Sequence, residues 1–397
     1  MKIGIITQYY ESYNYGGNLQ SYALVKTLNN LSFNAEQISY NYFVPAEFLS
    51  FKEKIKKYPF YKVVKKVIKR IINIPKDIYM KSMNKSFVNN INIRRQSFVE
   101  FNKSIIMHSA TIYDRYLVKE SVRSYDVFIT GSDQVWNFAW YNPSFFLDFV
   151  SSDKKKISYA ASISMNSLTV EQKDIFRKHL KDFDAVSVRE KSDVELIKDL
   201  SPVPVVNTLD PTLLLSREDW DEVCSDRVVD EKYLFSYFLG NNKKERKFAK
   251  EFAKRKGLKV VTLPHMCGYQ SADKNFGDYQ LWDVGPEKFL SLIKHAEYVF
   301  TDSFHAVVFS NIYHKQYYVF NRSSKGEMSS RIYNITELFD EQDRYCDTKE
   351  KETINYIENL APINYDREFT KFEEMKEISI DFLKNSLGEP NTNEDEG

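Results

Sequence analysis

The chain has 397 residues, of which 43% are hydrophobic and 15% aromatic, and its net charge is +1. This length exceeds what one hydrophobic core usually serves, and the composition excludes a disordered chain. Three cysteines stand far apart without a CxxC pair, which argues against a disulfide framework or a zinc ribbon. No stretch approaches about 18 uninterrupted apolar residues, and the first residues resemble a strand more than a signal peptide. We therefore expect a cytoplasmic protein.

The N-terminal half alternates apolar β-branched runs with amphipathic stretches. Strands are predicted at Lys2–Thr7, Val127–Thr130, Lys156–Ala160 and Ala185–Val188, and a helix over Asn18–Leu31. Such alternation indicates a parallel sheet with helices on both faces. We assign residues 1–200 to a first Rossmann-like domain.

A basic insertion at about residues 51–104 interrupts this domain. It holds fifteen Lys and Arg against three acidic residues, a local charge of +12, so the rest of the chain carries −11. Apolar residues recur in it at near-helical spacing, and Lys62, Lys65, Lys66, Lys69 and Arg70 occupy the opposite positions. A basic face beside an apolar stripe suits an anionic membrane surface. The alternative is a stripe packed on the first domain with solvated lysines.

The alternation restarts after a proline-containing stretch, residues 201–215, which we interpret as a linker. Strands are predicted at Tyr233–Leu239, Leu258–Leu263, Tyr298–Thr301 and Gln316–Phe320, and helices at Lys243–Lys256, Pro286–Ala296 and Ser303–Tyr313. Residues 216–364 thus form a second Rossmann-like domain. A last helix within 365–387 is expected to pack back across the first domain, and 388–397 form a tail. Ligands of such sheets bind beyond the carboxyl ends of strands, so two facing sheets would share one cleft.

Two loops of the first domain are candidates for an acceptor or cleft site. In the first, Tyr15, Gly16, Gly17 and Asn18 follow the first strand, where paired glycines let the backbone approach a ligand. The alternative is an ordinary tight turn.

The second loop, 131–137, crowds polar groups and an indole at the end of a strand. Ser132, Asp133, Trp136 and Asn137 could stack on and hydrogen-bond a sugar-like ligand. Alternatively, Asp133 caps a turn and Trp136 belongs to the core.

Charged residues also follow two other predicted strands. Arg189 could hold a carboxylate or phosphate, or could pair with Glu190 or a nearby acid. Asp302 is predicted to cap a helix whose first turn carries Ser303 and His305. A histidine at a helix N-terminus can change protonation when an anion binds, which suits acid–base catalysis. No metal-binding spacing of histidines is present, so no metal is expected.

Seven segments in chain order resemble the polysaccharide pyruvyl transferase family: YNYGGNLQSYAL, GSDQVWN, FLDFV, KKKISYAAS, VSVREKS, LDPTLLL and TDSFH. The resemblance covers about residues 1–340. It implies a GT-B-like fold with the acceptor on the first domain and the donor on the second. It also implies phosphoenolpyruvate as donor, with no cofactor, and a ketal formed on two hydroxyls of a hexose. The acceptor would be a cell-surface polysaccharide or its lipid-diphosphate-linked precursor at the inner membrane face.

The same resemblance assigns roles to residues. Arg189 and His305 match the arginine and histidine that hold and activate the donor. Ser303 stands where other branches have an arginine, so the donor's anionic groups are expected to rely on Arg331. Ala306 replaces a glycine common after the histidine.

Two rival interpretations remain. A GT-B glycosyltransferase using a nucleotide sugar would need a carboxylate for the ribose, for which Glu327 is the candidate. An inactive binding homologue is kept open by the departures at Ser303 and Ala306. No nucleic-acid partner is expected.

Overall fold

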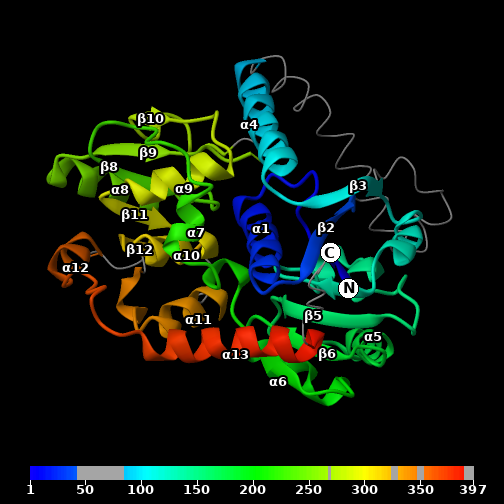
Figure 1. The fold of residues 1–397 in the computed structure, drawn as a ribbon. Coiled ribbons are helices and arrows are strands. Elements are labelled where there is room, and N and C mark those ends of the chain that lie inside the picture. Colours follow the sequence, from blue (N-terminus) through cyan, green and yellow to red (C-terminus); the bar gives the residue numbers. More distant parts are fainter. Residues whose placement is uncertain (43–84, 267–269, 323–329, 347–352, 389–397) are drawn as a thin grey trace, which may run out of the picture.

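The computed structural model describes residues 1–42, 85–266, 270–322, 330–346 and 353–388 (Figure 1). The fold is α/β and GT-B-like, as predicted: two Rossmann-like domains, each built on a parallel sheet. The sheets have the orders β3-β2-β1-β4-β5-β6-β7 and β10-β9-β8-β11-β12-β13. Both orders reverse beside the first strand of the domain, which is where α/β sheets hold ligands.

The first domain contains the strands β1 (Lys2–Ile6), β2 (Asn34–Tyr40), β3 (His108–Tyr113), β4 (Val127–Thr130), β5 (Lys155–Ala161), β6 (Ala185–Val188) and β7 (Val205–Asn207). Its helices are α1 (Tyr15–Asn30), α4 (Lys85–Ser104), α5 (Val170–Leu180) and α6 (Lys191–Ile197), with short 3-10 helices at Val118–Ser124, Phe138–Trp140, Pro143–Phe146 and Lys198–Leu200. The four strands predicted here are confirmed. Ile6 of β1 lies opposite Thr130 of β4, so the loops that follow both strands meet at one edge of the sheet.

The second domain contains β8 (Tyr233–Tyr237), β9 (Lys259–Thr262), β10 (Tyr279–Gln280), β11 (Tyr298–Thr301), β12 (Gln316–Phe320) and β13 (Tyr345–Cys346). Its helices are α8 (Lys243–Lys256), α9 (Pro286–Lys294), α10 (Phe304–Ile312), α11 (Ser330–Leu338), α12 (Thr353–Asn359) and the short Gln342–Arg344. The crossover holds η5 (Pro211–Leu213) and α7 (Arg217–Asp221), and the chain closes with α13 (Thr370–Leu387).

Two boundaries differ from the prediction. Helix α1 begins at Tyr15, because the Asn14 side chain accepts a hydrogen bond from the Gly16 amide and caps the helix. The paired glycines therefore belong to its first turn and not to a loop. The predicted linker is also not a plain linker, since β7 lies within it and pairs with β6 at the sheet edge. An edge strand tolerates the prolines around it.

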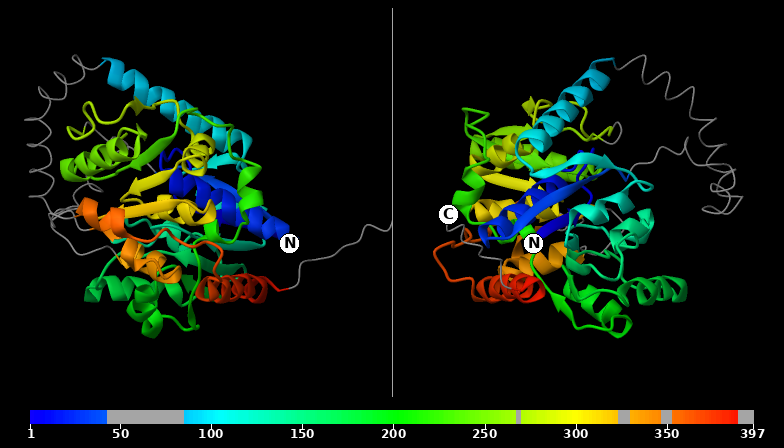
Figure 2. Two further views of the ribbon diagram at one scale, coloured as in Figure 1. Left: turned by 90° about the vertical axis from the view of Figure 1, so that its left-hand side faces the viewer. Right: turned by 45° about the vertical axis from the view of Figure 1, so that its right-hand side comes forward.

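Helix α1 lies between the two domains and is buried on nearly all sides (Figures 1 and 2). Its apolar side chains join those of α9 and α10 in one core cluster that continues from one domain into the other. Tyr15 stacks on Phe289 of α9 with ring centroids 4.4 Å apart, and its hydroxyl donates to the Val284 carbonyl. The interface is therefore packed like a protein interior.

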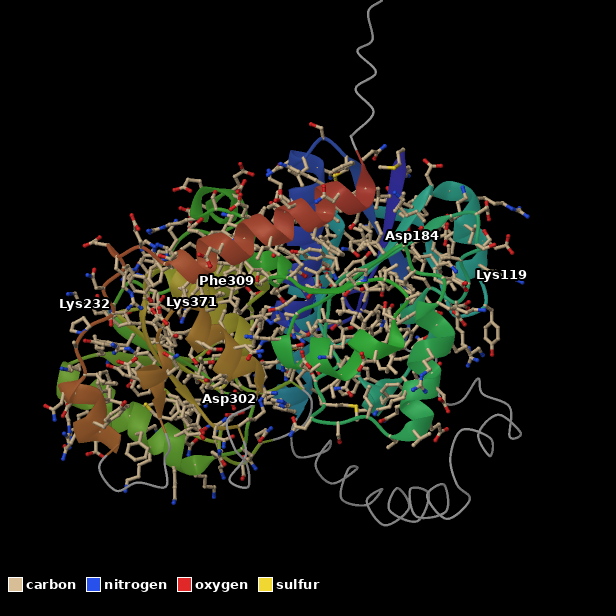
Figure 3. All side chains as sticks on the ribbon, turned by 90° about the horizontal axis from the view of Figure 1, so that it is seen from below. Lys119, Asp184, Lys232, Asp302, Phe309 and Lys371 are labelled. Atoms are coloured by element: carbon tan, nitrogen blue, oxygen red, sulfur yellow. The ribbon has the colours of Figure 1, made fainter. Side chains whose placement is uncertain are left out.

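Helix α13 crosses beneath both domains (Figures 1 and 3). Leu383 and Leu387 are buried in the shared core. The Leu209 amide donates to Ser379 Oγ, and Lys155 Nζ donates to the Ser386 carbonyl. The last helix thus packs on the first domain.

Helix α4 contacts the second domain. The guanidinium of Arg94, 1% exposed, donates to the carbonyls of Pro264, Leu281 and Trp282. Ser97 Oγ adds a 2.8 Å hydrogen bond to Asp283. Of the predicted insertion 51–104, residues 51–84, including the basic face and its stripe, lie outside the described residues. Among the helices that are described, none has the length and apolarity needed to cross a membrane.

Candidate active site

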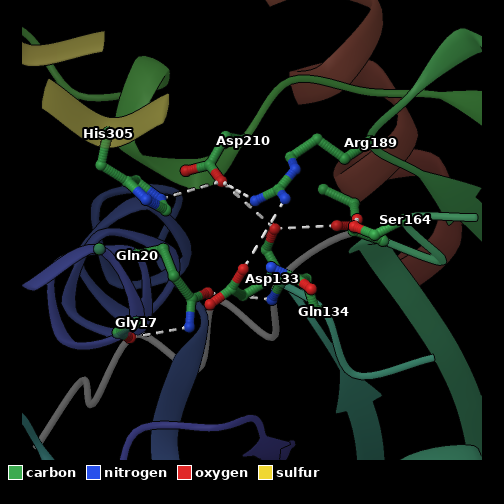
Figure 4. A network of polar contacts seen from close by, with 12 residues as sticks. Gly17, Gln20, Asp133, Gln134, Ser164, Arg189, Asp210 and His305 are labelled. Carbon is green, nitrogen blue, oxygen red and sulfur yellow. Dashed lines mark hydrogen bonds and ion pairs between the residues drawn. The ribbon is translucent and has the colours of Figure 1, made fainter. Parts of the chain in front are cut away.

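Charged side chains from both domains meet at the carboxyl ends of the central strands (Figure 4). Arg189, directly after β6, is at the centre of this cluster. Its Nη1 lies 2.7 Å from Asp210 Oδ2 and its Nε 3.0 Å from Glu190 Oε1. Its Nη2 lies 3.7 Å from Asp133 Oδ1 and makes no hydrogen bond within the described residues. The ion pair with Glu190 or a nearby acid, weighed as the alternative for Arg189, is what the structure contains.

Asp210, in the crossover between the domains, connects Arg189 to the second domain. Its Oδ1 accepts hydrogen bonds from the Thr212 amide and hydroxyl, which caps η5. Its Oδ2 faces both Arg189 and His305 Nε2, the latter at 3.5 Å. Burial disfavours the ionised carboxylate, but His305, Arg189 and Thr212 together outweigh this and keep the pKa of Asp210 below its usual value. Asp210 is therefore a buried carboxylate that lies between Arg189 and His305.

His305 is the second residue of α10 and sits against the first turn of α1. A Cβ atom added to Gly16 would lie 1.9 Å from His305 Nδ1, so the imidazole fits only because residue 16 has no side chain. The predicted cap is wrong in detail. Ser303 occupies the N-cap position without a side-chain bond, while the Asp302 carboxylate accepts from the Leu239 and Gly240 amides. Asp302 thus fixes the end of β11 against the turn after β8.

A buried carboxyl pair lies behind Arg189. Asp193 accepts a hydrogen bond from the Ile163 amide and interacts with Glu190. Burial and the charge of Glu190 raise the pKa of Asp193 to about 9. Burial also opposes ionisation of Glu190, but Arg189 outweighs it and lowers the Glu190 pKa. At neutral pH, Asp193 is therefore protonated and Glu190 ionised.

Arg331, in the first turn of α11, approaches the same region from the second domain. It forms no hydrogen bond or ion pair with any residue that the structure describes. Burial and the like charge of Arg189 lower its pKa, which is partly offset by Glu190 and Asp133. Arg331 is thus a cation without an ion-pair partner among the described residues.

A cavity of about 320 Å³ opens beside these groups. It is lined by Arg189, Glu190, Lys191, Asn207, Thr208, Leu209, Asp210, Leu213, Phe304, Arg331, Asn334, Ile335, Glu337, Leu338, Lys371, Glu374 and Met375. This volume is at the lower end for small-molecule sites. His305 does not line the cavity, because Asp210 stands between them.

Some predicted site residues have structural roles instead. Trp136 is 1% exposed, stacks on Phe146 and donates its indole N–H to the Phe145 carbonyl, so it belongs to the core. Asn137 caps the 3-10 helix Phe138–Trp140. Neither faces the cavity.

The first-turn residues of α1 make contacts within the protein. Tyr15 is part of the domain interface, and Asn18 Nδ2 donates to the carbonyls of Ser12 and Asn14. Gly17 packs against the Gln8 carbonyl. Gly16 does reach the site, but it contacts His305 in place of a ligand.

The loop after β4 contributes two of its four predicted residues. Asp133 lies beside Arg189, as given above. Ser132 Oγ donates to the Ala160 carbonyl and lies 3.5 Å from Asp210 Oδ2. Ser132 and Asp133 therefore lie next to the charged side chains of Asp210 and Arg189, respectively.

Sequence reasoning missed Asp210 and Asp193 as members of the site, and named Glu190 only as an alternative partner of Arg189. The Asp210–Pro211 pair, after a short strand, was a signal that could have identified the first of them. No group of His, Cys, Asp and Glu suited to a metal ion occurs among the described residues. Glu327, the candidate ribose ligand, lies outside them.

Comparisons with solved structures find likenesses of fold. UDP-GlcNAc 2-epimerase from Methanocaldococcus jannaschii is 13% identical, with a TM-score of 0.47 over 95% of this chain and 99% of that one. The Neisseria meningitidis epimerase bound to UDP-GlcNAc is 11% identical, with a TM-score of 0.43 over 97% and 100%. The E. coli ADP-heptose LPS heptosyltransferase II is 10% identical, with a TM-score of 0.38 over 95% and 99%. Identities and TM-scores this low do not assign an activity to this chain.

Comparison with curated proteins gives no significant match. The family model for polysaccharide pyruvyl transferases matches residues 14–324, which is most of the chain and contains Asp133, Arg189, Asp210 and His305. The chain belongs to the polysaccharide pyruvyl transferase family.

Proposed function

We propose that this protein transfers pyruvyl from phosphoenolpyruvate to two hydroxyls of a hexose in a cell-surface polysaccharide or its precursor. Family membership supports a transferase of this kind. The observation that carries the proposal is the row His305–Asp210–Arg189, which joins the two domains beside the unmatched Arg331. It combines a proton donor with cations for an anionic donor substrate.

The reaction needs one proton and a leaving phosphate. His305 protonates the methylene carbon of phosphoenolpyruvate, and one acceptor hydroxyl attacks the adjacent carbon. Inorganic phosphate then departs, and the second hydroxyl closes the ketal while the hydroxyl protons pass to the phosphate and to His305. Asp210 stabilises the imidazolium, as a buried carboxylate does for a catalytic histidine. Asp302 fixes the end of β11, directly before the helix that carries the histidine, against the turn after β8, and Ser303 is the N-cap residue of that helix.

The charges of the site favour this assignment. With Asp193 protonated, the carboxylates of Asp133, Glu190 and Asp210 lie around the guanidinium group of Arg189, and Arg331 makes no ion pair with a described residue. Arg331 contacts the donor's phosphate or carboxylate, and Arg189 keeps Asp210 in place. Because Asp210 separates His305 from the cavity, the donor must reach the imidazole past this carboxylate.

The test is to incubate the pure full-length chain with phosphoenolpyruvate and candidate saccharides. We expect phosphate release and a mass gain on the saccharide equal to pyruvic acid less water. His305→Ala should lower turnover by at least the ~10²-fold typical of general acids, with an unchanged circular dichroism spectrum. Near-normal turnover of this variant rules out the catalytic role of His305.

The same assay separates the rivals. Transfer from nucleotide sugars, and none from phosphoenolpyruvate, identifies a glycosyltransferase. Binding of phosphoenolpyruvate without turnover identifies an inactive homologue. Neither result is compatible with the proposal.

We also propose that the enzyme works at the cytoplasmic membrane face on a lipid-diphosphate-linked acceptor. The support is the charge of +12 in residues 51–104, since each basic residue near an anionic surface contributes about 1 kcal/mol. Sedimentation with anionic liposomes at low and high salt tests this. Equal, poor pelleting of the wild type and of a variant with Lys62, Lys65, Lys66 and Lys69 changed to Gln contradicts it.

A further inference from the structure

The cavity beside Arg189 has walls from two different parts of the chain. The floor comes from the first domain, the crossover and α10, and includes Arg189 and Asp210, whose side chains are 3% and 0% exposed. The outer part comes from α11 and α13. We call it the C-terminal wall; it consists of Asn334, Glu337, Leu338, Lys371, Glu374 and Met375.

The boundary of the family match falls between these two parts. The match ends at residue 324, so it includes the cavity residues of the floor, whereas the C-terminal wall lies outside it together with Arg331 and Ile335 of α11. Family members share a description as pyruvyl transferases, which the matched part encodes. The part of the cavity outside the match is therefore where a property particular to this chain, such as the choice of acceptor, can be set.

The C-terminal wall has the chemistry of a site for a neutral sugar. Asn334 Nδ2 is buried and has no hydrogen-bond partner among the described residues, so it can donate to a ligand hydroxyl. The carboxylates of Glu337 and Glu374 form no ion pair with a described residue and can accept from hydroxyls. Met375 and Leu338 offer apolar surface for the C–H face of a pyranose.

The charge of the C-terminal wall argues against an anionic ligand at this position. Lys371 Nζ is held 2.6 Å from Asp340 Oδ1, outside the cavity lining, so its charge is already matched. The two glutamates then leave the wall negative, whereas Arg331 interacts electrostatically with Arg189, Glu190 and Asp133 of the first domain. An anion is drawn to the floor and a neutral polyol to the wall.

We propose that the C-terminal wall selects the acceptor, and that the acceptor presents a neutral hexose to it. This inference rests on the proposed function only where it calls the bound sugar an acceptor. It predicts saccharide binding whether or not transfer occurs. The hexose lies between α11 and α13 with its reacting hydroxyls toward Arg189 and Asp210. The first-turn residues of α1 and the loop 131–137 take no part in its recognition.

The experiment uses the full-length chain and p-nitrophenyl β-glucoside, β-galactoside and β-mannoside, without any donor. Saturation-transfer NMR measures the binding of each hexoside to the wild type and to the variants Glu374→Gln and Asn334→Ala. Glu377→Gln is the matched control, because Glu377 is exposed on the same helix and does not line the cavity. Calorimetry with phosphoenolpyruvate follows the donor separately.

We expect at least one hexoside to bind the wild type and the control equally. Loss of one hydrogen bond to a charged or buried group should weaken that binding about tenfold in each variant, with unchanged affinity for phosphoenolpyruvate. Equal hexoside binding by all four proteins, or no hexoside binding by any, overturns the inference. So does weakened phosphoenolpyruvate binding in the two variants, since the wall would then belong to the donor site. Hexoside binding without any phosphoenolpyruvate binding instead leaves the inference standing and contradicts the proposed function.

Discussion

Arg189 and Arg331 face the same cavity from opposite domains, but their guanidinium groups have different surroundings. Arg189 is enclosed by Asp210 at 2.7 Å, Glu190 at 3.0 Å and Asp133 at 3.7 Å. Arg331 has no acidic partner at ion-pair distance among the described residues, and its pKa is lowered by burial and by Arg189. Arg189 therefore contributes to the stability of the fold. The Arg331 guanidinium has no ion-pair partner among the described residues and is available to an anionic ligand.

We therefore expect the two arginines to contribute to different properties, Arg189 to the stability of the fold and Arg331 to ligand binding. A buried ion pair is costly to break from one side, because the remaining carboxylates keep their charge without compensation. A buried cation without a partner costs stability in the free protein and regains it when an anion binds. Substitutions at the two arginines should therefore change different measurements.

The largest effect is expected at Arg189. Arg189→Ala leaves Asp210 and Glu190 unpaired, and should lower the free energy of unfolding by about 3–5 kcal/mol, measured by chemical denaturation. Arg177→Ala is the control, because its ion pair with Asp174 is exposed and should contribute less than about 1 kcal/mol. Equal losses in the two variants would falsify the positioning role of Arg189.

Gly16→Ala tests whether the histidine must stay where the two domains place it. The added Cβ would lie 1.9 Å from His305 Nδ1, so the ring or α1 must shift. A displacement of this kind should reduce turnover about 10²-fold, measured by phosphate release. Gly17→Ala, whose Cβ would meet the Gln8 carbonyl at 3.0 Å, should lose far less activity. If both variants turn over equally, the Gly16–His305 contact has no catalytic importance.

Arg331→Gln should weaken binding and spare stability. Loss of a charge-assisted contact should cost about 1.5–3 kcal/mol of affinity for phosphoenolpyruvate, measured by calorimetry. The free energy of unfolding should stay the same or rise, because an unmatched buried charge has been removed. Arg331→Lys should restore affinity in part, since the charge returns without the planar fork. A loss of stability with unchanged affinity would reverse the roles assigned to the two arginines.

The pH dependence of stability concerns the carboxyl pair behind Arg189. The pKa of Asp193 is raised to about 9, so between about pH 4 and pH 9 the folded protein holds a proton that the unfolded chain has released. This contribution to stability is complete below pH 4 and is lost as the pH rises toward 9. Asp193→Asn, which cannot ionise, should flatten the fall in unfolding free energy over this range. Parallel pH profiles for the wild type and the variant would contradict the shift.

Helices and strands could be predicted from the sequence where the spacing of apolar residues is regular. The predicted strands from Lys2 to Phe320 all exist, because each is a short buried run bounded by turns. Strand β2 went unpredicted because its run includes Asn34, Glu36 and Gln37; Gln37 is buried by donating to the Ser21 carbonyl. Strand β7 was not predicted because the prolines around it suggested a linker.

Part of the site could be predicted from the sequence. Arg189 and Asp133 follow strands of one sheet, so their proximity could be expected from the topology. The contact of His305 with Gly16 depends on how the two domains dock, which local pattern does not specify. Trp136 was misplaced because the aromatic residues that cover it, Phe145 and Phe146, arrive from a later turn.

Arg94 has a consequence for motion. Its guanidinium on α4 of the first domain donates to the carbonyls of Pro264, Leu281 and Trp282 in the second. Parting the domains would leave these groups without their partners, at about 1.5–3 kcal/mol for each hydrogen bond to the cation. An open form would then make up fewer than about one molecule in a thousand. The protein is therefore closed for nearly all of the time, and a ligand that meets it first encounters the side chains at the mouth of the cavity.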